Sequence, residues 1–177
     1  PTEHGGYVAG RIVSFASADG LKLEGRLTVP SVSRGVAVLC HDPEPANGLM
    51  PNVLMPAFRR SLEHVGWASL RFNYRGVGRS EGSYGGGLTE TADVQGAIAY
   101  VRRQVAGVPC ALIAWSSGAI LAIRACIGLE GVDAFIGIAP PVSSDGQAIP
   151  SAKSLISWRP RTLLIAGSND AECSAED

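Results

Sequence analysis

Apolar and polar positions alternate along the first part of the chain and then give way to a fully apolar run. Residues 11–17 and 21–29 alternate and are joined around Asp19-Gly20, a dipeptide typical of tight hairpins in which both central residues have positive φ. Residues 36–40 are apolar throughout, as in a strand buried on both faces. The pattern predicts an antiparallel hairpin at one edge of a sheet, followed by an interior strand.

Helical and strand patterns alternate in the rest of the chain. Apolar spacing predicts helices over 53–65, 89–105 and 117–129, and strands over 67–72, 110–115, 132–139 and 162–166. Strands separated by helices predict parallel pairing through right-handed crossovers, with helices on both faces. The expected fold is a three-layer α/β sandwich with a mostly parallel twisted sheet. Residues 11–177 are expected to form this single domain, after a loose tail at 1–10.

Composition and charge narrow the function classes. With 177 residues, of which 46% are apolar and 18% charged, the chain predicts one globular domain. A net charge of −1 without a basic stripe argues against nucleic acid or a membrane as partner. The four cysteines occur singly in the sequence, without the spacing of a metal site; they are Cys40, Cys110, Cys126 and Cys173. Buried free thiols are the expected state, and this fits a cytoplasmic protein.

One serine lies where an expected strand turns directly into an expected helix. Ala114 and Gly118 stand two positions before and after Ser116, and the sharp turn of a nucleophile elbow requires small residues at both places. In that turn the Ser116 hydroxyl projects from the carboxyl edge of the sheet, and the Ser117 N–H points into an oxyanion hole. The alternative is an ordinary N-cap serine. The strand before Ser116 and the helix after it favour the elbow.

An acidic residue follows the last expected strand. Asp170 comes later in the chain than Ser116, where the acid of a Ser…Asp…His order falls, and it would orient a histidine. The alternative is a turn aspartate, because Ser168-Asn169-Asp170 is also turn chemistry. Asp93 and Asp145 stay open as substitutes for Asp170.

The chain resembles the α/β-hydrolase superfamily, in particular the small lidless bacterial proteins related to dienelactone hydrolases and peptidase-like esterases. Residues 70–82, LRFNYRGVGRSEG, are similar to the family's strand-to-loop segment after its fourth strand, and the other matching segments follow in the family's order. The resemblance implies a hydrolase that needs no cofactor. Arg71, Asn73 and Arg75 are expected to fix this loop by hydrogen bonds rather than to contact substrate.

Two departures from the family pattern concern the rest of the site. The family's catalytic histidine follows the acid, whereas His4, His41 and His64 all precede Ser116. We therefore expect a C-terminally incomplete hydrolase fold whose histidine is absent from this chain.

The loop after residues 36–40 is the second departure. The family draws an oxyanion N–H from about the position of Pro43, which has no N–H, so Asp42 or Glu44 is expected to supply it.

These observations predict a serine hydrolase of a small ester, thioester, lactone or amide, in which Ser116 is the nucleophile. The expected partner is a small-molecule substrate in an open site that His41, Trp115 and Tyr84 would line. A position in the core is an equal alternative for Trp115. The alternative is a non-catalytic member of the fold that binds a small molecule or a partner chain. In that case the open last strand would allow a homodimer by strand pairing.

Overall fold

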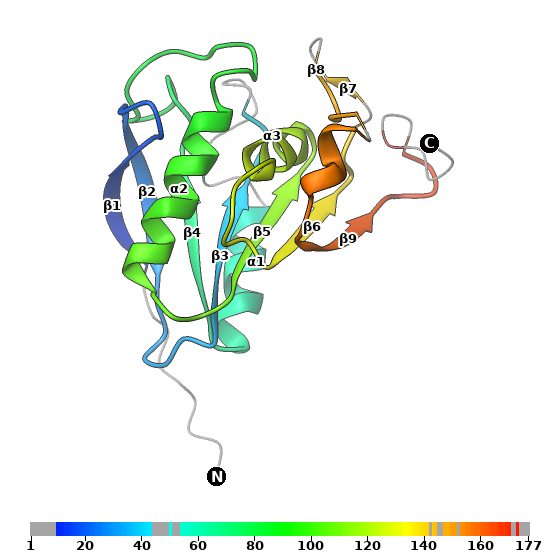
Figure 1. Cartoon of the computed structure of the whole chain (residues 1–177). Coiled ribbons are helices and arrows are strands. Elements are labelled where there is room, and N and C mark those ends of the chain that lie inside the picture. Colours follow the sequence, from blue (N-terminus) through cyan, green and yellow to red (C-terminus); the bar gives the residue numbers. More distant parts are fainter. Residues whose placement is uncertain are drawn as a thin grey trace.

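The computed structural model describes residues 10–43, 50, 54–141, 143–144, 147–151, 153–170 and 173. Its main sheet has the strand order β1-β2-β4-β3-β5-β6-β9 (Figure 1). The strands of this sheet are β1 (Arg11–Ala16), β2 (Lys22–Thr28), β3 (Gly35–Cys40), β4 (Trp67–Phe72), β5 (Cys110–Trp115), β6 (Ala134–Ile138) and β9 (Arg161–Ile165). Strand β2 is antiparallel to both of its neighbours, and the pairs from β4 to β9 are parallel.

Helices cover the two faces of the sheet, which confirms the predicted three-layer α/β fold. Helix α1 (Leu54–His64) lies on one face, and α2 (Thr91–Gln104) and α3 (Ser117–Cys126) lie on the other (Figure 1). None of the helices in the described part of the chain has the length and apolarity that a membrane crossing demands. Residues 1–9 of the predicted tail 1–10 lie outside the described residues, and the single-domain assignment stays a prediction.

The core is divided by the sheet, as the apolar run of β3 predicted. All six residues of β3 are buried. The larger cluster joins the sheet to α2 and α3, and a smaller cluster lies under α1. All four cysteines are buried and unbridged. Burial raises the pKa of the Cys40 thiol to about 12, so this side chain acts as a small apolar residue.

Two local predictions differ from the structure. The turn at Asp19-Gly20 is not the two-residue hairpin that was expected, because only Gly20 has positive φ, at 94°. The loop instead spans residues 17–21, and the Leu21 N–H donates to the side-chain hydroxyl oxygen of Ser17 at 2.8 Å. The connection 140–159, expected to be irregular, contains the short strands β7 (Ser143–Ser144) and β8 (Gln147–Ala148) and the 3₁₀ turn η1 (Ser154–Ser157).

The glycine-rich loop after β4 is fixed by a buried ion pair. The Arg75 guanidinium lies 2.7 Å from Asp93 Oδ1, at the start of α2, and 2.9 Å from Asp19 Oδ1 in the β1–β2 loop. Asp93 has no exposed surface, and its burial raises the pKa of its carboxyl group while Arg75 opposes that shift. Asn73 accepts a hydrogen bond from the Met50 N–H and donates one to Glu24. For Arg75 and Asn73, the predicted loop-fixing role is therefore confirmed.

A buried histidine ties the end of β3 to the end of β4. His41 has no exposed surface, and its ring nitrogens lie 2.6 Å from the Asp42 carbonyl oxygen and 2.9 Å from the Phe72 carbonyl oxygen. Burial lowers the pKa of His41, and the two carbonyl contacts oppose that shift only in part. The folded protein therefore favours the neutral imidazole.

Replacing Arg75 with methionine leaves the Asp93 carboxylate buried without its partner. We expect the free energy of unfolding to fall by about 3–5 kcal/mol, measured by urea denaturation. Arg103→Met, on the exposed side of α2, is the matched control and should change stability by less than about 0.5 kcal/mol. Adding Asp93→Asn to Arg75→Met should recover part of the loss. A loss no larger than that of the control would contradict the central role of this ion pair.

The His41 environment predicts a pH dependence of stability. The unfolded chain takes up a proton at His41 below its ordinary pKa of about 6.5, whereas the folded protein does so only at lower pH. Stability should therefore fall as the pH drops below about 6.5, with a slope of up to about 1.4 kcal/mol per pH unit from this group. His41→Gln should remove that contribution, and His64→Gln, at an exposed position, should retain it.

An NMR titration of the wild-type ring tests the same point without a substitution. The His41 ring protons should not shift between pH 7 and pH 6, and a midpoint at or above the ordinary pKa would refute the assignment.

Candidate functional site

Ser116 occupies a strained turn between β5 and α3. Its backbone has φ 54° and ψ −138°, and it is one of two non-glycine residues of positive φ in the described chain. An N-cap serine has extended backbone angles and accepts a hydrogen bond from the following turn, whereas the Ser116 side chain makes no such bond. The geometry therefore does not support the N-cap alternative, and it leaves the half-buried hydroxyl unused by the helix.

The turn depends on close packing between α3 and the end of β3. A Cβ atom at Gly118 would overlap the carbonyl oxygen of His41 and lie 3.0 Å from the Cys40 carbonyl oxygen. Both obstacles are backbone atoms that cannot move aside, so only glycine fits. Ala114, on the strand side of the turn, is completely buried. Of the two small residues that flank Ser116, Gly118 is thus needed sterically, and Ala114 is enclosed by the core.

The loop after β3 lies against this turn. The His41 carbonyl faces Gly118, and the ring of His41 is enclosed, so the ring is not accessible from the surface. Asp42 is half-buried and its carbonyl is held by the His41 ring. Pro43 follows directly and is buried. Residue 44 lies outside the described residues, so the predicted choice between Asp42 and Glu44 stays open.

Hydrogen bonds connect the Ser116 turn to the last strand of the sheet. The Ser116 N–H donates to the Ile138 carbonyl oxygen at 3.0 Å, at the end of β6. Ala139, which follows Ile138, has φ 45°. Its N–H donates to the carbonyl oxygen of Ile165, at the end of β9, at 2.7 Å. Since these strands are parallel, Ser116 and the turn containing Asp170 lie at the same edge of the sheet.

Asp170 ends the turn that follows β9. Its side chain is half-buried, and its Oδ1 accepts a hydrogen bond from the Cys173 N–H at 3.2 Å. It therefore has the local bonding of a turn aspartate, and its triad role stays a prediction. Of the two alternative acids, Asp93 is occupied by Arg75, and Asp145 lies outside the described residues.

The remaining predicted residues lie apart from one another. Trp115 is half-buried and packs into the cluster under α1, which is the core position that the sequence left open. Tyr84 is half-buried in the loop after β4. His64 is exposed at the end of α1, just before β4 begins. It therefore lies at the amino ends of the parallel strands, whereas Ser116 lies at their carboxyl ends. Within the described residues, no group of three or more His, Cys, Asp or Glu side chains could hold a metal ion.

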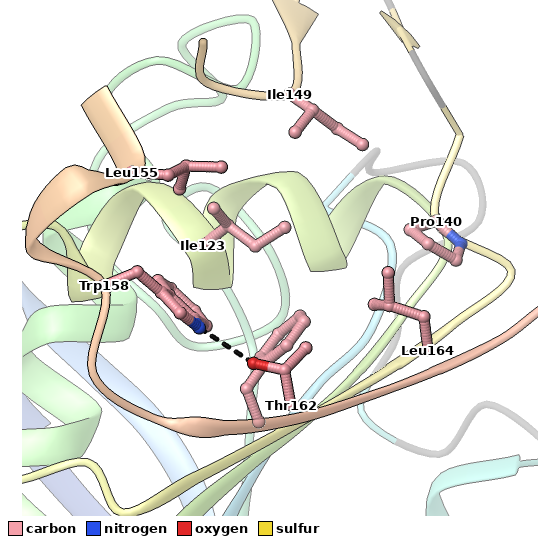
Figure 2. A pocket seen from close by; sticks show the side chains of 8 residues that line it. Ile123, Pro140, Ile149, Leu155, Trp158, Thr162 and Leu164 are labelled. Carbon is pink, nitrogen blue, oxygen red and sulfur yellow. Dashed lines mark hydrogen bonds between the residues drawn. The ribbon is translucent and has the colours of Figure 1, made fainter. Parts of the chain in front are cut away.

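An apolar pocket of about 430 Å³ lies elsewhere, along α3 and β9 (Figure 2). None of the predicted site residues lines it. Its lining residues are Ile123, Phe135, Pro140, Ile149, Leu155, Trp158, Thr162 and Leu164. The sequence signal was weak, because four of these residues are scattered through the mainly polar connection 140–159.

The comparisons with known proteins agree with the α/β fold. The family model described as serine aminopeptidase, S33 matches residues 54–173, a segment that contains both Ser116 and Asp170. An uncharacterized protein of Rickettsia prowazekii is 27% identical over 158 residues. The match covers 88% of this chain, which spans 66% of that relative's length.

Solved structures extend the comparison to the fold. An α/β serine hydrolase homologue from Coxiella burnetii has a TM-score of 0.78 and 25% identity, covering 97% of this chain and 80% of that chain. A lidless α/β serine hydrolase from Xanthomonas campestris has a TM-score of 0.77 and 26% identity, covering 98% and 78%. Because the family model matches more than half of the residues and these structures share the fold, the chain belongs to the serine aminopeptidase S33 family of the α/β-hydrolase superfamily.

Proposed function

We propose that the protein is a serine hydrolase in which Ser116 is the nucleophile. The observation that carries the proposal is the backbone of Ser116, which is held at φ 54° between β5 and α3 without a capping hydrogen bond. Such strain is unfavourable by about 1–3 kcal/mol and is commonly found where the conformation serves a function. A serine in this turn presents its oxygen beyond the carboxyl ends of the strands, where a substrate carbonyl can reach it.

The oxyanion would be stabilised by backbone N–H groups next to Ser116. The first N–H groups of a helix have no acceptor within that helix, so the Ser117 N–H at the start of α3 can donate to a developing negative charge. Asp42 is the second proposed donor, because Gly118 packs directly against the loop that contains it. Pro43 has no N–H and cannot take this role.

Asp170 is proposed to orient the general base, a histidine. Neither described histidine is placed for that role. His41 is enclosed between two carbonyl oxygens, and His64 lies at the amino ends of the parallel strands, away from Ser116. The mechanism therefore requires a histidine from outside the described residues. It would accept the Ser116 proton as the hydroxyl attacks and pass it to the departing alcohol, thiol or amine, which leaves the acyl-enzyme. It would then take a proton from the attacking water and return it to Ser116 as the acid is released.

The substrate class we propose is a small ester, thioester, lactone or amide. The connection between β6 and β9 runs only from residue 139 to residue 160. The regular elements in its described residues are the two-residue strands β7 and β8 and the 3₁₀ turn η1. It supplies little to enclose a long substrate, and the similar Xanthomonas protein is described as lidless. A proposed cytoplasmic location fits the four unbridged cysteines.

The nucleophile is tested with a fluorophosphonate probe on the full-length protein. We expect covalent labelling at Ser116, mapped by mass spectrometry, and a loss of p-nitrophenyl acetate turnover of at least about 10³-fold in Ser116→Ala. Ser61→Ala, an exposed serine on α1, is the matched control and should keep wild-type turnover. Absence of both labelling and turnover in the wild type would refute the hydrolase and favour the non-catalytic alternative.

The acid is tested by Asp170→Asn, which keeps the side-chain shape but removes the charge that stabilises an imidazolium. We expect kcat to fall by about 10⁴-fold, with a much smaller change in KM. Glu130→Gln, at an exposed position after α3, should leave both constants unchanged. Wild-type kcat in Asp170→Asn would show that another carboxylate serves the base.

A further inference from the structure

Besides Ser116, one other residue that is not glycine has a positive φ in the described chain, and it is Ala139. Its φ of 45° lies in the left-handed region, which is unfavourable for a residue that carries a Cβ atom. At the remaining described positions of positive φ the chain has glycine. Residues held in such a conformation cluster at functional sites, where the surrounding structure enforces it. Ala139 is therefore a candidate for a role in the site.

The left-handed turn lies where two hydrogen-bond ladders end. The Ile138 carbonyl oxygen accepts from the Ser116 N–H, and the Ala139 N–H donates to the Ile165 carbonyl oxygen. These bonds continue the parallel ladders of β6 with β5 and with β9 one step past the strand. The Ala139 carbonyl oxygen makes no hydrogen bond with the described residues. The chain thus leaves the sheet at Ala139.

Two prolines fix the direction in which the chain leaves. Pro140 and Pro141 are both buried, and neither has an N–H that could extend the ladder to β9. Their ring-fixed φ angles leave this segment little freedom. Ala139 itself is half-buried, so part of its surface is exposed at the carboxyl edge of the sheet. The ladder on one side and the prolines on the other set the position of this exposed part.

The strand order places Ala139 between the candidate nucleophile and the candidate acid. Strand β6 lies between β5 and β9, so the Ser116 turn and the Asp170 turn are on either side of its end (Figure 1). A base that bonds to both residues must therefore span the end of β6. The loop after β3, which carries the proposed oxyanion donor Asp42, is on the opposite side of Ser116.

This arrangement decides which part of a substrate approaches Ala139. When Ser116 attacks, the carbonyl oxygen turns toward its donors, of which Asp42 is on the β3 side. The leaving group must take its proton from the base, which spans the end of β6. The leaving group therefore lies over the end of β6, next to the exposed part of Ala139.

We propose that Ala139 is a specificity-determining residue that limits the size of the leaving group. The inference rests on the proposed serine-hydrolase function and names the departing alcohol, thiol or amine as the part of the substrate that the residue selects. A larger side chain at this position would occupy the space that a bulky leaving group needs. The acyl group, which stays on Ser116, carries no such restriction from Ala139.

Asparagine at position 139 tests side-chain size without adding backbone strain, because asparagine tolerates positive φ. In the full-length protein we expect Ala139→Asn to lower the ratio of kcat/KM for 1-naphthyl acetate to that for phenyl acetate by at least about 10-fold. These esters share the acyl group and differ in the leaving group. The ratio for phenyl butanoate to phenyl acetate, which differ in the acyl group, should change by less than about 3-fold.

Glycine and serine at the same position complete the test. Ala139→Gly relieves the strain without adding a side chain, so it should not lower the naphthyl ratio. Ala139→Ser, which adds a single oxygen atom, should lower that ratio by at least about 3-fold and serves as the test if Ala139→Asn does not fold. Ala106→Asn is the matched control, since Ala106 is exposed in the turn between α2 and β5, and both ratios should keep their wild-type values.

Fluorophosphonate labelling of Ser116 separates failure of this inference from failure of the proposed function. Normal labelling with an unchanged naphthyl ratio in the enlarged variants would overturn the role of Ala139 alone. An equal loss for the butanoate ester, or a loss in Ala139→Gly, would also overturn it, because the effect would then come from general disturbance of the site. Absence of labelling and turnover in the wild type would overturn the proposed function, and this inference with it.

Discussion

The contact between Gly118 and the His41 carbonyl determines how the chain passes the carboxyl edge of the sheet. Helix α3 approaches the end of β3 so closely that no side chain fits between them. The chain must therefore leave β5 and enter α3 within one residue, and Ser116 takes the positive φ that this requires. The same contact brings the loop after β3 next to the first turn of α3. A steric constraint on one glycine thus places two candidate oxyanion donors and the candidate nucleophile together.

The parts of the fold that the sequence predicted well are those governed by burial. The strand at 36–40 and the helices on both sides of the sheet follow from apolar periodicity, which packing preserves. The β1–β2 turn was predicted less well, because Asp-Gly indicates a local turn type while Asp19 is engaged by Arg75. No local pattern contains that contact, since residues 19 and 75 are far apart in sequence. Long-range ion pairs of this kind override turn preferences.

In the candidate site too, residues in a local motif could be predicted from the sequence, and residues that only the fold brings together could not. Ser116, Ser117 and Gly118 could be identified because the elbow is a local motif with strict steric requirements. The pocket beside β9 could not, because it combines single apolar residues from α3, β6, the β6–β9 connection and β9. Asp170 is intermediate. Its position after a strand is a local signal, but a turn aspartate gives the same signal, and the hydrogen bond from Cys173 fits both interpretations.

The position of Asp170 relative to Ser116 depends on one strand pair. Ser116 is bonded to the end of β6, and β6 is bonded to the end of β9 through Ala139 and Ile165. Asp170 follows β9 by a short turn, so the ladder between β6 and β9 sets its distance from Ser116. An edge strand exposed on both faces opens more readily than an interior one, since fewer apolar contacts resist its separation. The strength of the β6–β9 ladder therefore limits the movement of Asp170, which links the stability of this strand pair to the precision of the proposed catalytic site.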